Sequence, residues 1–147
     1  MSITLTHQEA DSLLAMDKHF QGTDQCAFPE VGGNLRIPLL SADRHEEFSL
    51  DITRSKIELR KNTFQNRARK AVVLARIDLG GSPHRNPDDA EIPCPHMHVY
   101  REGFGDKWAY ALPANFTSAQ DVWQTLKEFM AYCNIVTRPT ITKGLFI

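Results

Sequence analysis

Apolar and polar residues alternate along the middle of the chain, and this alternation predicts β-strands. Every second residue over 47–53 is apolar, which is typical of a strand with one buried face. The stretch 71–79, AVVLARIDL, is dominated by apolar residues and predicts a central strand. Shorter patterns predict further strands at residues 35–40, 57–59, 95–101 and 107–112, with one last short strand within 137–147.

Two other stretches show the period of an amphipathic helix. Thr6 and Glu9 have the spacing of a capping box, and the apolar positions that follow predict a helix over 7–20. Near the C-terminus, Thr117 or Ser118 is expected to cap a second helix with an apolar stripe of Val122, Trp123, Leu126, Phe129, Met130 and Cys133. The order helix, strands, helix predicts an α+β fold, in which an N-terminal and a C-terminal amphipathic helix pack on a mainly antiparallel sheet.

Composition is that of a soluble protein with one domain over residues 1–147. The chain is 41% hydrophobic and 24% charged, and no apolar run approaches the roughly 20 residues that cross a bilayer. Its first residues lack the basic start and apolar middle of a signal peptide. Three cysteines without a close pair fit a reducing compartment. We therefore expect a cytoplasmic protein without membrane contact.

Positive charge is concentrated in one segment. Between Arg54 and Arg76 there are eight basic residues and one acidic residue, in a chain of net charge −1. Such a segment either binds phosphate or forms a solvated face that pairs with the acidic remainder. The first interpretation predicts a nucleic-acid-binding loop in which Phe64 stacks on a base, and the second leaves Phe64 in the core. The candidate binding residues are Arg54, Arg60, Lys61, Phe64, Gln65, Arg67 and Arg69.

Side chains suited to a reactive site gather between residues 76 and 113. Strand alternation places His96, His98 and Tyr100 on one face, turned toward a cleft or solvent. The polar turn after the central strand carries His84, which approaches both other histidines if the two strands pair. On the central strand, the same alternation puts Arg76 and Asp78 on a common face.

Three interpretations of the histidines remain open. They are structural residues, a metal-free acid–base pair, or a Zn²⁺ site with Cys94 or Asp88 as a fourth ligand. Because Pro93 and Pro95 disfavour a strand that begins early enough to include Cys94, we expect no stoichiometric zinc and no cofactor. The charged residues of the following hairpin are expected to pair across it, and they are Arg101, Glu102, Asp106 and Lys107.

Four motifs resemble an uncharacterised family of bacterial, phage and prophage proteins over the whole chain. They are IPLLSADRHEEFSLDITR, KNTFQNRARK, RIDLGGSPHRNPDD and PHMHVYREGFGDKWAYALP. The resemblance implies a small cytoplasmic protein of a mobile genetic element, and it implies no activity. A local resemblance is to the TumE-type toxins of toxin–antitoxin modules, which carry an Arg-x-Asp strand, then Pro-His, then Pro-His-x-His. The matching residues here are Arg76, Asp78, Pro83, His84, Pro95, His96 and His98.

These observations favour a metal-independent endoribonuclease toxin. One histidine would deprotonate a ribose 2′-OH, another would protonate the leaving 5′-oxygen, and Arg76 or Arg101 would stabilise the developing charge. Asp78 would orient a histidine or Arg76, and Tyr100 would position the phosphate. The candidate catalytic residues are His84, His96, His98, Arg76, Asp78, Tyr100 and Arg101. RNA and an antitoxin are the expected partners. The alternative is a non-catalytic phage or prophage protein that binds and inhibits a host or defence protein.

Overall fold

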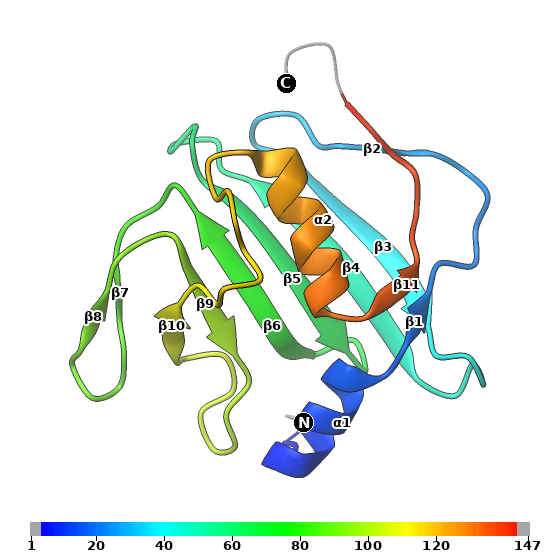
Figure 1. Cartoon of the computed structure of the whole chain (residues 1–147), viewed down its shortest axis with the longest axis horizontal. Coiled ribbons are helices and arrows are strands. Elements are labelled where there is room, and N and C mark those ends of the chain that lie inside the picture. The colour runs from blue at the N-terminus through cyan, green and yellow to red at the C-terminus, as the bar shows by residue number, and fades with distance from the viewer. Residues whose placement is uncertain (1–3, 144–147) are drawn as a thin grey trace.

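The computed structural model describes residues 4–143 and is dominated by one large sheet (Figure 1). Strands contain 37% of the residues and helices contain 14%. The sheet has eight strands in the order β10-β9-β6-β5-β4-β3-β1-β11, and every neighbouring pair is antiparallel except β1 and β11. A mainly antiparallel sheet with two helices is therefore confirmed.

Two helices and twelve strands follow one another along residues 4–143. They are α1 (His7–Ala15), β1 (Lys18–His19), β2 (Cys26–Ala27), β3 (Asn34–Leu40), β4 (Glu47–Arg54), β5 (Asn62–Ala68), β6 (Val72–Leu79), β7 (His84–Arg85), β8 (Glu91–Ile92), β9 (His96–Val99), β10 (Ala109–Ala111), α2 (Val122–Tyr132), β11 (Ile135–Thr137) and β12 (Ile141–Thr142). Two further small sheets pair β12 with β2 and β7 with β8.

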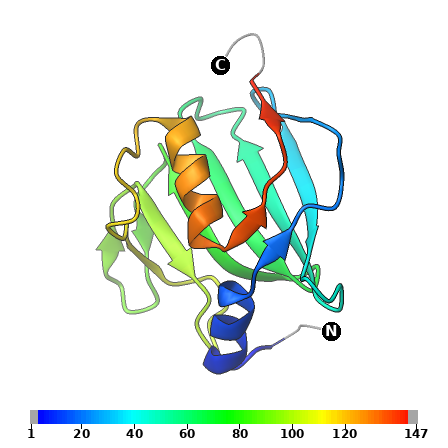
Figure 2. The same cartoon turned by 45° about the vertical axis from the view of Figure 1, so that its right-hand side comes forward.

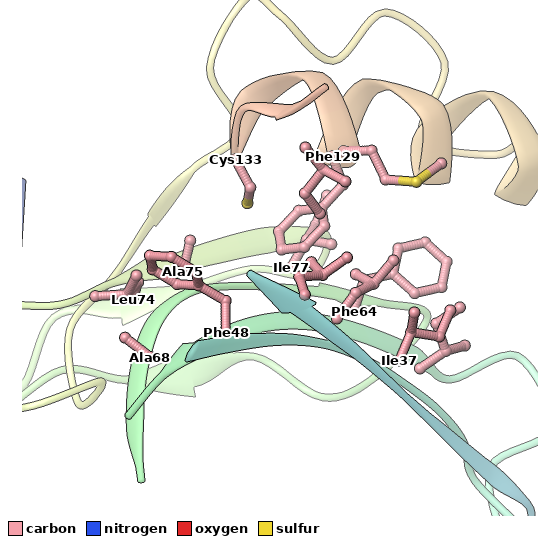
Figure 3. Close-up of a cluster of buried hydrophobic side chains, with 14 of the residues drawn as sticks. Ile37, Phe48, Phe64, Ala68, Leu74, Ala75, Ile77, Phe129 and Cys133 are labelled. Carbon is pink, nitrogen blue, oxygen red and sulfur yellow. The ribbon is translucent and has the colours of Figure 1, made fainter. Parts of the chain in front are cut away.

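The hydrophobic core lies between the sheet and α2, which runs over the sheet in Figures 1 and 2. Phe64 on β5 and Phe129 on α2 are fully buried, with ring centroids 6.3 Å apart (Figure 3). On β5, residues with even numbers are buried and residues with odd numbers are partly exposed. Because strand residues alternate between faces, the odd positions belong to the face of the sheet opposite α2.

Lys18 joins the ends of both helices. Its side chain is fully buried, and Nζ donates to the carbonyl oxygens of Leu14, Met16 and Cys133 at 2.7–2.9 Å. Burial lowers the pKa of Lys18 to about 8, so the ammonium group still has its three donors at neutral pH. The lysine thus satisfies carbonyl groups that the C-terminal turns of α1 and α2 leave without helical partners.

The first helix is shorter than the predicted 7–20. The capping box of Thr6 and Glu9 is present, but α1 ends at Ala15 because Met16 adopts an extended conformation. The chain then enters β1, where Lys18 can turn inward to the carbonyl groups of the helix. Apolar spacing alone could not predict this end, because the interactions that favour it come from Cys133, 115 residues away.

Two other predicted boundaries are also wrong. Ile57 and Leu59 do not continue a strand: β4 pairs directly with β5, so they lie in the connecting turn with 95% and 63% of their surface exposed. The second helix is capped by Asp121, whose side chain accepts from the amide of Gln124, and not by Thr117 or Ser118. Thr117 instead hydrogen-bonds the Glu128 carboxylate.

Candidate functional site

A row of polar side chains crosses the face of the sheet opposite α2. Strand register places five of them side by side on β3, β4, β5, β6 and β9, in the order Arg36, Asp51, Gln65, Arg76 and His98. Apolar residues at these positions would have needed a second covering layer. The row ends, at β9, in a cluster of histidine, aspartate and arginine side chains.

Asp78 is the centre of that cluster. Arg76 donates to both oxygens of its carboxylate, at 3.0 and 3.2 Å, and donates a third hydrogen bond to Asp106 at 2.9 Å. Burial raises the pKa of Asp78, but the polar and charged groups around its carboxylate, including the Arg76 guanidinium, lower it by more, so it lies well below its ordinary value. The Asp78 carboxylate is therefore ionised in the folded protein, and it is a poor proton acceptor.

Three histidine rings surround this carboxylate. The centroid of the His84 ring lies 4.6 Å from that of His98, and the centroids of His96 and His98 are 5.1 Å apart. His96 and His98 come from β9, whereas His84 comes from the β7–β8 hairpin. The expectation that β9 turns its histidines toward a cleft or solvent is wrong, because His96 and His98 are only 2% and 1% exposed.

The backbone holds one nitrogen of each ring. Nδ1 of His98 lies 2.7 Å from the Asp106 carbonyl oxygen, and Nε2 of His84 lies 2.7 Å from that of Lys107. Nδ1 of His96 lies 3.3 Å from the Pro93 carbonyl oxygen. Carbonyl oxygens only accept, so the facing nitrogen of His98 carries the proton. Its Nε2, 3.3 Å from Asp78, is buried and has no hydrogen-bond partner among residues 4–143.

Two predicted catalytic residues do not join the cluster. Tyr100 follows the last residue of β9 and is buried, with its hydroxyl group donating to the carbonyl oxygen of Leu5 and accepting from its amide. Arg101 stacks its guanidinium group over the ring of Trp108, 4.1 Å from the centroid. Neither can position or stabilise a phosphate at the histidines in this arrangement.

Among residues 4–143, the predicted charge pairs across the β9–β10 hairpin do not form. Glu102 accepts from the amide of His7, and Asp106 pairs with Arg76. Of the two candidate fourth metal ligands, Cys94 bonds the backbone of Asp78 and Gly81, and Asp88 accepts from the amide of Ala90.

Comparison with known proteins places the chain in a family. The model of a family of unknown function, DUF6978, matches residues 5–135. The chain belongs to this family. No curated protein matches the chain, and no solved structure does. The DUF6978 match includes every residue of the cluster, but it carries no activity with it. No helix within residues 4–143 is long and apolar enough to cross a membrane.

In this DUF6978 protein, most of the predicted RNA-binding cations already have partners. Arg67 binds the carboxylate of Asp51, Arg69 binds Glu46, and Arg54 donates to the carbonyl oxygen of Pro29. Gln65 also donates to Asp51. Phe64 is fully buried, so the prediction that it stacks on a base is wrong. Arg60, Lys61 and Arg69 are the exposed cations of the candidate set, and of these Arg60 and Lys61 form no ion pair among residues 4–143.

A polar depression of about 470 Å³ lies beside the cluster on the same face of the sheet. Its lining residues are Thr53, Ser55, Lys61, Thr63, Gln65, Arg76 and Asp78. Gly80, at φ +70°, lets the backbone of Arg60 approach so closely that a Cβ would lie 2.1 Å from the Arg60 carbonyl oxygen. This approach brings the turn that carries Lys61 to the end of β6.

Sequence reasoning missed Thr53 and Ser55, left Thr63 out of the candidate binding residues, and expected Asp106 to pair across its own hairpin. The alternation that identified the buried face of β4 also implied a polar face, and Thr53 and Thr63 are opposite one another on it. Their role in a common surface could have been recognised from that pattern. Asp106 gave no such signal, because its contact with Arg76 joins the tip of a hairpin to the central strand.

Proposed function

We propose that the protein is a small cytoplasmic endoribonuclease toxin of a mobile genetic element. The cluster of Asp78, His96 and His98 would be its reaction centre, and the polar depression would receive the phosphate. The observation that carries the proposal is the free Nε2 of His98, which is buried beside an ionised carboxylate and the guanidinium group of Arg76. An unpaired imidazole nitrogen in such surroundings is ready to take up a proton.

In this proposal His98 removes the proton from a ribose 2′-OH. The 2′-oxygen attacks phosphorus and the bond to the 5′-oxygen breaks, with His84, the most exposed of the three rings, returning a proton to the leaving oxygen. Asp78 stabilises the imidazolium that forms, as the carboxylate of a histidine–aspartate pair does. Arg76 and Lys61 face the phosphate from the depression. His98 is almost fully buried, so this proposal requires the loop bearing His84 to move aside before RNA can reach it.

Replacing His98 with Gln is expected to lower the rate of RNA cleavage by about 100-fold or more, because a positioned general base contributes that much. The measurement is cleavage of end-labelled RNA by purified protein, with circular dichroism to verify folding. His45→Gln is the matched control, since the His45 side chain is 87% exposed and lies in a turn. Equal cleavage by wild type and His98→Gln would remove the proposed base.

RNA binding itself is expected to depend on Arg60 and Lys61. Each phosphate contact contributes about −0.7 to the log–log slope of affinity against salt concentration on single strands, so removing both side chains should flatten the slope by about 1.4. Arg69→Ala is the control, because Arg69 is already engaged with Glu46. Fluorescence anisotropy of short RNA across a salt series gives the slopes. A slope altered as much by Arg69→Ala would contradict this assignment.

The alternative is a phage or prophage protein that binds and inhibits a host or defence protein without catalysis. One observation favours it: Val31, Ile57 and Leu59 are exposed aliphatic side chains, and the turns that carry them meet where Gly32 approaches Lys56. Exposed aliphatic groups at one place are common at protein-binding sites. The pairing of Arg67 and Arg69 with acidic residues also reduces the charge available for RNA.

Growth after induction separates the two functions. If the protein is a nuclease, growth arrest requires His98 and survives the exchange of Ile57 and Leu59 for Ser. If it acts by binding a protein, the reverse holds. Both residues are exposed, so their replacement is expected to change stability by less than about 0.5 kcal/mol.

A further inference from the structure

Three potential ligand atoms meet between β6 and β9. Asp78 Oδ2 lies 3.1 Å from His96 Nε2 and 3.3 Å from His98 Nε2, and all three atoms lie within 4.8 Å of one another. Around a tetrahedral zinc ion with bonds of about 2.0–2.1 Å, neighbouring ligand atoms are about 3.3 Å apart. Both distances to Asp78 are therefore close to the spacing of neighbouring ligands on a single ion.

A hydrogen bond accounts for the distance between Asp78 and His96 but not for the distance between Asp78 and His98. His96 Nε2 can donate to Asp78. The ring is then either neutral, with the lone pair of Nδ1 directed at the Pro93 carbonyl oxygen, or positively charged. His98 donates from Nδ1 to Asp106, so its Nε2 is a lone pair in the neutral ring, and it faces a carboxylate oxygen. A lone pair of His98 and an oxygen of the Asp78 carboxylate repel one another in a buried space, and a cation placed between them removes the repulsion.

The surroundings of the three atoms resemble those of metal-binding residues. Histidines that bind metals generally have their second ring nitrogen held by a carbonyl or carboxylate group, as His98 and His96 do through Asp106 and Pro93. Arg76 holds the Asp78 carboxylate in a fixed orientation through hydrogen bonds to both of its oxygens, including Oδ2, which faces the rings. Asp78 also lines the polar depression, so one of the three ligand residues borders a space that water can enter.

We propose that Asp78, His96 and His98 bind one divalent transition-metal ion, with Zn²⁺ as the best match to two imidazoles and a carboxylate. Three protein ligands and an open fourth position form the usual arrangement of a catalytic zinc site. This proposal departs from the sequence-based expectation of a metal-free site, which considered Cys94 and Asp88 as the additional ligands. If RNA cleavage also occurs here, the ion would replace His98 as the activating group, because a metal lowers the pKa of a bound oxygen.

Titration of Zn²⁺ into chelator-treated, full-length protein tests the proposal by calorimetry, with elemental analysis of the recovered protein. The expected result is one zinc ion per chain and a Zn²⁺-dependent rise in Tm. His98→Gln and His96→Gln should weaken binding by about 100-fold or more, since loss of outer-sphere partners alone costs 10–100-fold. His45→Gln should bind as the wild type does. Equal Zn²⁺ binding by His98→Gln and His45→Gln would overturn the site.

X-ray absorption of the zinc-loaded wild-type protein gives a second test that needs no variant. The expected first coordination sphere contains nitrogen and oxygen only, with two imidazoles. Sulfur in that sphere would place the ion at a cysteine and overturn the proposal, as would the absence of bound zinc.

The metal site and the nuclease function can fail separately. Stoichiometric zinc in a protein that leaves RNA intact supports the site and removes the nuclease. RNA cleavage that continues in excess chelator, by a protein that takes up no zinc, removes the site and keeps the nuclease.

Discussion

Lys18→Met is expected to lower the free energy of unfolding by about 4 kcal/mol. The substitution keeps most of the apolar stem but removes three donors. It leaves the carbonyl oxygens of Met16 and Cys133 without their side-chain partner, whereas that of Leu14 still accepts from the Asn134 amide. A buried acceptor that loses its hydrogen bond costs about 1–3 kcal/mol, and part of this cost is recovered where water enters. Urea unfolding followed by circular dichroism measures the loss.

Lys127→Met is the control for this prediction, because Lys127 lies on the exposed side of α2. Its replacement should change the free energy of unfolding by less than about 0.5 kcal/mol. If Lys18→Met were as stable as this control, the carbonyl groups would have other partners, and the lysine would not join the two helix ends.

Phe64→Ala is expected to cost about 4 kcal/mol of stability. Phe64 is fully buried on β5 and packs against Phe129 of α2, and replacing a core Phe by Ala typically costs about 3–5 kcal/mol through lost burial and the remaining cavity. The loss is measured by urea unfolding at an unchanged m-value, which shows that the unfolded state is not altered.

Two comparisons complete this prediction. Phe104→Ala should cost much less, since Phe104 is 40% exposed in a hairpin loop. Phe64→Leu, which keeps most of the core filled, should leave RNA affinity unchanged. A large loss of RNA affinity in a folded Phe64→Leu protein would restore the interpretation that Phe64 stacks on a base.

Much of the sheet could be predicted because alternation is a local signal. The stretches 47–53 and 71–79 correspond to β4 and β6, and the histidine strand corresponds to β9. The errors arose where distant contacts decide the local structure. The exposed Ile57 and Leu59 imitate a strand pattern, but the pairing of β4 with β5 requires a turn at that position.

The candidate site was predictable in its residue types and not in its environment. Alternation placed Arg76 and Asp78 together, and the polar turn suggested that His84 approaches the other histidines. Burial of His96 and His98 could not be predicted, because it depends on how two hairpins fold over β9. The pairing of Arg67 with Asp51 was equally hidden, since strand register, and not the charge of either segment, brings the two side chains together.

The parallel pairing of β1 with β11 has a consequence for synthesis of the protein on the ribosome. β1 is made early, but its neighbour β11 is made more than 110 residues later. The same delay applies to the carbonyl oxygen of Cys133, which is the third acceptor of the Lys18 ammonium group. Until α2 leaves the exit tunnel, the apolar face of β4, β5 and β6 has no cover. The nascent chain should therefore present a chaperone-binding surface from the emergence of β4, β5 and β6 until residues 122–135 emerge.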